Sequence, residues 1–505
     1  MQCVSIRDSN CHCTEAIGNN MSVSQVPPSE DWVTDVDSEI QNGSIQIPIW
    51  SKRSIYKVPE GFGDPNRKEA YKPKLVSFGP YHYGEFPLKQ VEEHKRRVLI
   101  HFLGRSNKSA SDCVVAVEGV VQQLMDSYDQ LEGEWRDRKR FVQLMIYDGC
   151  FMIEILRNVG VSGSGYSDDD PIFSNHASLC TLPRIKRDML MIENQLPLPL
   201  LKTLLAFESG SPQDDEYINQ LVMKFFDIPL STCMIGQIGQ RRHVLDVVRQ
   251  SMLQDTSVRP SICSRIFTGT MDLVRLMGQR TCPQIFNRCS WQGDASTGQS
   301  MCQPLFELCK RRPQNKHEVI WPATQLHEAG IRFKKIKTQS LKSIKFDKGF
   351  LFLPGTLSLP VIEVDDATES KFLNLMAFEQ LHAGTSSEVS SYVSFMDNII
   401  DTEKDVILLN KKRIIKNFVG TDQAVADLFN GIAYDVPIDP NSSLGEVHKN
   451  VTDYCNGCCR QSLANLWHTH FGSPWSCISL FAAIFLLCLT VTQAVYQILD
   501  FYRKR

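Results

Sequence analysis

The sequence predicts a mainly α-helical protein, in which a large helical domain carries a small antiparallel β element and one C-terminal transmembrane helix. Three observations support this fold class. Apolar residues recur at helical spacing in both halves of the chain, apolar pairs alternate with other residues over 344–364, and residues 476–499 form an apolar run without a formal charge.

The composition is that of a globular protein. Of the 505 residues, 42% are hydrophobic and 22% are charged, which excludes wholesale disorder, a collagen and a multi-pass membrane protein. The 54 basic and 57 acidic residues give a net charge of −3, so no global positive field would draw the chain onto nucleic acid. The 17 cysteines are an odd number, so at least one thiol is unpaired within the chain.

The chain opens with an acidic leader, residues 1–46, whose one Lys or Arg is Arg7 and which is rich in Ser and Asn. We expect this leader to be disordered. The main helical domain is expected over residues 47–435. Its first helix is indicated by Leu88, Val91, Val98 and Phe102, which repeat at helical spacing. Further helices are predicted at Val114 to Leu131, Arg138 to Asn158, Pro183 to Phe207, and Tyr217 to Phe226.

The middle of the domain departs from this pattern. Residues 231–316 carry twelve basic residues against five acidic ones and six cysteines, without sustained periodicity after Leu253. We interpret them as an insertion or a variable region. The small antiparallel sheet follows over 344–364, where apolar pairs such as Ile344/Phe346 and Leu357/Leu359 flank a break at Pro354. Helices then resume at Glu369 to Leu381, Ser390 to Ile400, Thr402 to Asn417, and Thr421 to Ala433.

The C-terminal part is predicted to be a membrane anchor. A cysteine-rich juxtamembrane linker, 436–474, leads into a transmembrane helix over 475–499, and a basic tail, 500–505, closes the chain. The run from Ser476 to Leu499 would reach about 36 Å at about 1.5 Å per residue, enough to cross a bilayer, which is therefore an expected partner. The expected location is the plasma membrane or the endoplasmic reticulum. The short tail favours a cytosolic body, whereas Arg503 to Arg505 favour the opposite orientation.

The sequence contains no strong catalytic motif. A P-loop, an H-E-x-x-H helix and a G-x-S-x-G elbow are all missing from the sequence, so we assign no catalytic residue and no cofactor. Four carboxylates interrupt apolar helical stretches, and they could either run acid-base chemistry or hydrogen-bond the fold: Asp148, Glu154, Asp188 and Glu193.

Metal binding and modification have only weak candidates. His82 and His94 fall near the first helix, and Cys455 and Cys458 with His468 have the residue types of a zinc site but loose spacing. Cys458 and its neighbour Cys459 are candidates for lipidation near the expected membrane. Sequons at Asn441 and Asn450 are candidates for glycosylation if the body is outside the cytosol.

Several short stretches together resemble the plant domain-of-unknown-function family 247, also called uncharacterised protein family 0481. The stretches that carry the resemblance are Ser77-Phe78-Gly79-Pro80-Tyr81-His82, Glu93-His94-Lys95, Asp148-Gly149-Cys150-Phe151, Glu193-Asn194-Gln195-Leu196-Pro197 and Ala377-Phe378-Glu379-Gln380. Their order is kept over about residues 45–500. Tyr83 departs from the family pattern, where a second His is common.

The resemblance implies a plant protein that is mostly helical, has a single anchor and has no established catalytic activity. Some grass relatives are tied to self-incompatibility, which is a recognition role. We therefore expect a membrane-anchored interaction or recognition protein with an unidentified protein partner. The alternatives are a membrane-bound enzyme that uses the four carboxylates, and a stress- or redox-responsive protein that uses its thiols.

Overall fold

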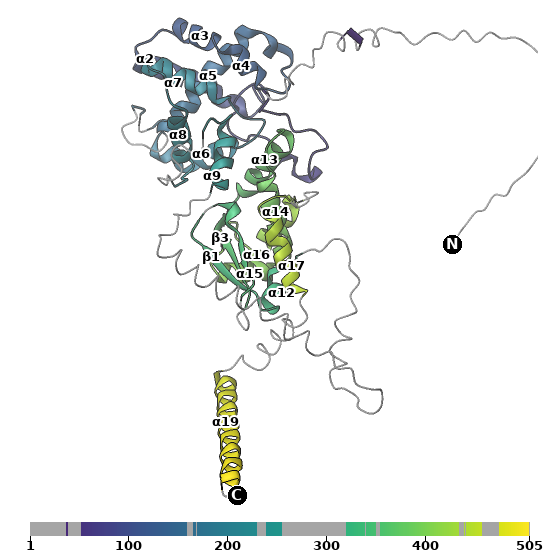
Figure 1. The fold of residues 1–505 in the computed structure, drawn as a ribbon. Coiled ribbons are helices and arrows are strands. Elements are labelled where there is room, and N and C mark those ends of the chain that lie inside the picture. Colours follow the sequence, from purple (N-terminus) through teal and green to yellow (C-terminus); the bar gives the residue numbers. More distant parts are fainter. Residues whose placement is uncertain are drawn as a thin grey trace, which may run out of the picture. The chain divides into compact units, whose positions relative to one another are not determined.

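The computed structural model describes residues 37–38, 52–158, 165–167, 169–229, 239–254, 320–338, 340–349, 354–433, 439, 441–456 and 474–503. The chain divides into two units, Met1–Ile49 and Trp50–Arg505, and every element discussed below belongs to the second. Helices dominate this unit (Figure 1), so the prediction of a mainly helical protein is confirmed.

The helices of the first half surround the long helix α5. Helix α5 spans Arg138–Asn158, as the periodicity predicts, and it contacts α2, α3, α7 and α8. The other elements here are η2 (Pro65–Tyr71), η3 (Leu88–Val91), α2 (Glu92–Ser106), α3 (Ala110–Glu118), α4 (Val121–Asp126), η4 (Gly133–Arg136), α6 (Asn175–Asp188), α7 (Leu198–Ser209), α8 (Asp215–Phe225) and α9 (Val244–Leu253).

Two of the predicted helices in this half are each divided in the structure. The helix expected over Val114 to Leu131 is the pair α3 and α4, which separate at Gly119 and Val120. The helix expected over Pro183 to Phe207 is the pair α6 and α7. Pro197, the N-cap of α7, has an extended backbone with ψ of 130°, so the two helices do not join.

The β structure is mixed, so the expectation of a purely antiparallel element is wrong. Strand β3 (Thr356–Pro360) pairs antiparallel with β2 (Lys345–Asp347), as predicted, but it also pairs parallel with β1 (Arg332–Ile336). A second, two-stranded sheet pairs β4 (Ile362–Val364) parallel with β5 (Ile415–Asn417). Parallel pairs join segments distant in sequence, which a search for neighbouring alternating runs misses.

The helices of the second half pack around these strands. They are α12 (Ala323–Glu328), α13 (Thr368–Leu381), α14 (Glu388–Ile399), α15 (Glu403–Lys411), α16 (Asp422–Ile432) and α17 (Gly445–Cys455). The helix expected over Thr402 to Asn417 ends early because Arg413 adopts a left-handed backbone with φ of 58°, and the chain continues as β5. Helix α17 lies in the segment predicted as a linker, and its Val451 and Cys455 are buried.

The C-terminal helix α19 spans Pro474–Arg503. Within the described ranges, no helix is both long and apolar enough to cross a membrane. This finding contradicts the prediction of a transmembrane helix over 475–499. The predicted bilayer contact through Ser476 to Leu499 depended on that helix. The division into domains, the membrane location and the orientation of the body stay untested predictions.

Candidate functional site

The four carboxylates are each engaged in holding the fold together. Asp188, at the C-terminal end of α6, accepts backbone hydrogen bonds from Lys74, Leu75 and Val76 at 2.7–3.1 Å. Its side chain is fully buried, and burial raises its pKa above the usual range. A buried carboxylate that accepts three N–H bonds is fully used in fixing the chain.

Asp148 on α5 forms a buried ion pair with Lys95 on α2, the lysine of the Glu-His-Lys stretch. The Lys95 Nζ to Asp148 Oδ1 distance is 2.7 Å, and neither residue is exposed. Burial lowers the pKa of Lys95, but Asp148 and Glu92 raise it more, so the ammonium is charged. Burial raises the pKa of Asp148 to about 6, and the Lys95 charge opposes this shift.

The same pair positions the Ser-Phe-Gly-Pro stretch. Lys95 donates to the Ser77 carbonyl at 2.7 Å, and the Gly79 N–H donates to Asp148 Oδ2 at 2.7 Å. Gly79 has a φ of 76°, in the left-handed region that glycine tolerates best. The quoted stretches of three separate segments therefore converge on one buried polar cluster.

Asn194 and Gln195 of the Glu-Asn-Gln-Leu-Pro stretch complete this cluster. Asn194 Oδ1 accepts from the Phe78 N–H at 2.6 Å, and Asn194 Nδ2 donates to the Val76 carbonyl at 3.0 Å. Gln195 accepts from the Leu245 N–H at 3.0 Å and donates to backbone carbonyls of the α6–α7 connection. Both amides are fully buried and satisfied, so they act as structural connectors rather than as a reactive centre.

His82 and Glu193 form a further pair, with 2.9 Å between His82 Nε2 and Glu193 Oε2. Burial lowers the pKa of His82, but Glu193 and Glu85 outweigh it and the pKa lies above its ordinary value. Glu193 also accepts from the Val58 N–H at 2.6 Å. Glu193 thus links the His82 imidazole to the start of the domain.

The weak metal candidates do not come together in the described ranges, where no group of three or more His, Cys, Asp or Glu could hold an ion. His94 lies beside Arg97, and its pKa is lowered by burial and by that charge. Cys455 is buried in α17, and burial raises its pKa to about 11. Cys458, Cys459 and His468 lie outside the described residues. Of the sequon residues, Asn441 is exposed and Asn450 is half-buried on α17.

Glu154, the remaining carboxylate, lies on α5 and accepts hydrogen bonds from Arg105 and Tyr166. Arg105 donates to both of its oxygens, at 2.6 and 3.1 Å, and the Tyr166 hydroxyl donates at 2.9 Å. The four carboxylates therefore have separate structural partners, and the three cavities described next are lined by other residues. Convergence on an open pocket, which acid-base chemistry by this set requires, is not observed within the described chain.

An apolar cavity of about 450 Å³ lies between α2, α3 and α5. Leu99 and Leu103 from α2, Val114 from α3, and Val142 and Ile146 from α5 form much of its wall. Glu118, Lys139, Gln143 and Tyr147 add polar groups. A volume of this size with mostly apolar walls and a few polar groups is typical of binding sites. We call this region the α2–α3–α5 face.

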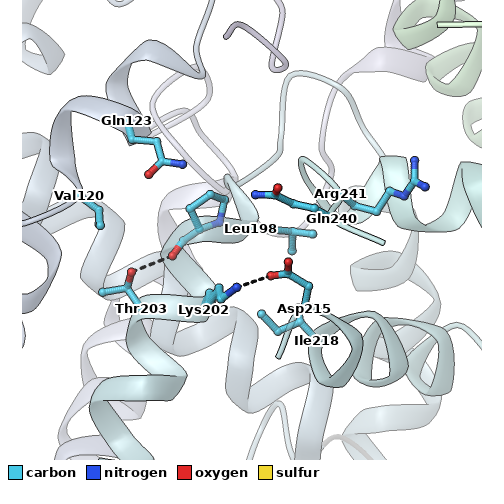
Figure 2. A pocket seen from close by; sticks show the side chains of 10 residues that line it. Val120, Gln123, Leu198, Lys202, Thr203, Asp215, Ile218, Gln240 and Arg241 are labelled. Atoms are coloured by element: carbon cyan, nitrogen blue, oxygen red, sulfur yellow. Dashed lines mark hydrogen bonds and ion pairs between the residues drawn. The ribbon is translucent and has the colours of Figure 1, made fainter. Parts of the chain in front are cut away.

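Two further cavities adjoin along α7. The first, of about 260 Å³, has both apolar and polar walls. We call it the polar cavity because Figure 2 shows the side chains of Gln123, Gln240, Lys202 and Asp215 around it. The second, of about 410 Å³, is lined mainly by apolar side chains, including Ala206 and Phe207. Lys202 and Thr203 line both cavities. We call the two together the α7 trough.

Sequence reasoning missed all three cavities. Leu99 lies on the first predicted helix, and the exposed Val114 and Val115 begin the second, so part of the apolar signal was available. The polar residues of the α7 trough carry no sequence signal, because Gln123, Lys202 and Gln240 come from α4, α7 and the segment before α9. Only packing brings them together.

Comparison with known proteins gives one family and two curated relatives. The family described as "Plant protein of unknown function", DUF247, matches residues 55–489. The Arabidopsis thaliana protein named UPF0481 protein At3g47200 is 30% identical over 467 residues, which cover 89% of this chain and 87% of the relative. The Arabidopsis thaliana protein named Putative UPF0481 protein At3g02645 is 24% identical over 92% of this chain and 93% of its own length. No solved structure matches the chain.

Proposed function

Since the chain belongs to the plant family of unknown function DUF247, whose curated members are named UPF0481 proteins, we propose that it is a recognition module that binds a protein partner without turnover. The partner binds the α2–α3–α5 face. The observation that carries this proposal is the apolar cavity of that face together with exposed apolar side chains on the same helices.

Those side chains are unusual for a surface that meets only water. Val115 on α3 is 68% exposed and Ile100 on α2 is 63% exposed. Val114 on α3 lines the cavity and is still 37% exposed. Clustered apolar side chains with a polar rim are typical of protein interaction sites. A partner that inserts an apolar side chain into the cavity would remove both the cavity wall and these residues from water.

The alternatives have less support. Catalysis by Asp148, Glu154, Asp188 and Glu193 would need at least one of them to face a substrate, whereas each is engaged by backbone or cationic partners. The thiol hypothesis depended chiefly on Cys458 and Cys459, which lie outside the described residues. Binding without turnover needs neither condition.

The test compares two exposed apolar positions. Val115→Asp places a charge on α3 next to Val114 of the cavity wall, and Leu179→Asp places the same charge on α6, where Leu179 is 77% exposed. Proteins retained from plant tissue by the full chain are identified by mass spectrometry. One that is retained by the Leu179→Asp chain but lost by the Val115→Asp chain is then purified, and its affinity is measured by calorimetry.

We expect Val115→Asp to weaken this partner at least tenfold, about 1.4 kcal/mol, and Leu179→Asp to leave its affinity unchanged. The partner should also be recovered with its mass unchanged after incubation, because no turnover is proposed. Equal affinity for all three chains contradicts the assignment of the face. A partner that is cleaved or modified by the purified chain contradicts the function.

A further inference from the structure

The α7 trough follows a single face of one helix. Leu198 and Pro199, then Lys202 and Thr203, line the polar cavity, and Lys202, Thr203 and the next pair, residues 206 and 207, line the apolar one. Each pair lies four residues, about one helical turn, after the last. From residue 198 to residue 206 the face extends about 12 Å at about 1.5 Å per residue.

The polar end presents two amides toward a common space. Gln123 comes from α4 and Gln240 from the segment before α9, and Figure 2 shows their side-chain amides on the two sides of the α7 N-terminus. Both residues are exposed, and neither side-chain amide has a hydrogen-bond partner among the side chains that the structure describes. An amide offers both donors and an acceptor, so this end can bind a group that also does both.

An ion pair between Lys202 and Asp215 lies at this end, beside Arg241, which also lines the cavity. Lys202 Nζ lies 2.7 Å from Asp215 Oδ1, and this ion pair joins α7 to α8. Figure 2 shows the side chain of Arg241 extending away from the pair. A carboxylate entering the cavity would approach Asp215, and an ammonium would approach Lys202. The pair therefore disfavours either charge and leaves an uncharged head group as the best fit.

The other end is apolar and well supported. Ala116 from α3 faces Ala206 and Phe207 of α7 across the second cavity, and Pro212 adds a further apolar wall. Lys108 Nζ lies 4.7 Å from the centre of the Phe207 ring, which holds that ring in place by a cation–π contact. An alkyl or aromatic group placed here would leave water without having to displace a polar partner.

We infer that the α7 trough binds a small uncharged amphipathic molecule. Its head carries an amide or hydroxyl group and hydrogen-bonds to Gln123 and Gln240, and its alkyl or aromatic tail lies against Ala206 and Phe207. The two cavities together fall within the size range of about 300–1,000 Å³ of small-molecule sites. This site is separate from the α2–α3–α5 face, so it goes beyond the proposed partner binding.

The test titrates the purified full chain with octanamide as the probe and follows binding by ligand-observed NMR. Octanoate and octylamine have the same tail with a charged head, and acetamide has the same head without the tail. We expect octanamide to bind at least tenfold more tightly than each of these three. Equal binding of octanamide and octanoate overturns the inference, because it would mean that only the tail is recognised.

Two variants locate the binding. Ala206→Trp fills the apolar end and should abolish octanamide binding, whereas Leu179→Trp on α6 adds the same side chain elsewhere and should leave it unchanged. Gln123→Met alters an exposed side chain without risk to the core and should reduce the preference for octanamide over octanoate at least threefold. Full octanamide binding by Ala206→Trp, or an unchanged preference in Gln123→Met, refutes the site. Far-UV circular dichroism and urea midpoints establish that each variant is folded.

Discussion

Replacement of His243 by asparagine should remove a defined part of the acid sensitivity of this fold. His243 is the N-cap of α9 and is fully buried. Its Nδ1 accepts from the Asp246 N–H at 3.2 Å, and its Nε2 lies 3.0 Å from the Ser54 carbonyl, to which it donates. Both ring nitrogens are therefore used by the neutral tautomer, and a second proton would face the Asp246 N–H.

The expected magnitude follows from the pKa. Burial lowers the pKa of His243 to about 4, whereas the side chain has a pKa of about 6.5 in the unfolded chain. Between these values the unfolded state binds more protons, so stability is present above pH 6.5 and is lost as the pH falls toward 4. The full loss is about 3 kcal/mol, and about 2 kcal/mol of it is lost by pH 5.

The assay is urea unfolding of the full chain and of the His243→Asn variant at pH 7 and pH 5. Asparagine also caps helices but does not titrate. The variant therefore keeps part of the cap and loses the pH-dependent contribution of this side chain to the free energy of unfolding. Burial also lowers the pKa of His382 to about 4, and because His382 is present in both chains its contribution cancels in the comparison. We expect the wild type to lose about 2 kcal/mol more than the variant between the two pH values. An equal loss in both chains would refute the reasoning.

Two further predictions concern the core. Lys95→Met leaves the Asp148 carboxylate buried without its cation. We therefore expect the free energy of unfolding at pH 7, measured with urea, to fall by about 3–5 kcal/mol. A loss below about 1 kcal/mol would contradict a buried ion pair. Gly149→Ala places a Cβ 2.4 Å from Leu204 Cδ1, where α5 meets α7, and should cost about 1–3 kcal/mol by overpacking. Its matched control is Gly104→Ala on α2, which meets no atom within 4 Å and should stabilise by about 0.5–1 kcal/mol. If thermal denaturation shows that the melting temperatures of both variants shift in the same direction from the wild type, close packing at residue 149 is not the cause of the destabilisation.

Local periodicity was sufficient where a helix packs along its whole length. Helix α5 has the predicted bounds because its apolar face continues along its whole length against four neighbouring helices. The same reasoning failed at α15, where a single left-handed residue, Arg413, ends the helix and strand β5 takes up pairing with β4. A strand of three residues has too little pattern to be found without its partner.

The sequence by itself determined the family, the mainly helical class, the bounds of helix α5, and the polar residues that interrupt its apolar face. Tertiary structure decided what those residues do. Asp188 binds backbone groups 112–114 residues away, and Arg249 pairs with Glu379, 130 residues away, at 2.7 Å. A helical or strand period records only neighbours within a few turns, whereas the partner of a buried charge and the walls of a cavity depend on which distant segments pack together.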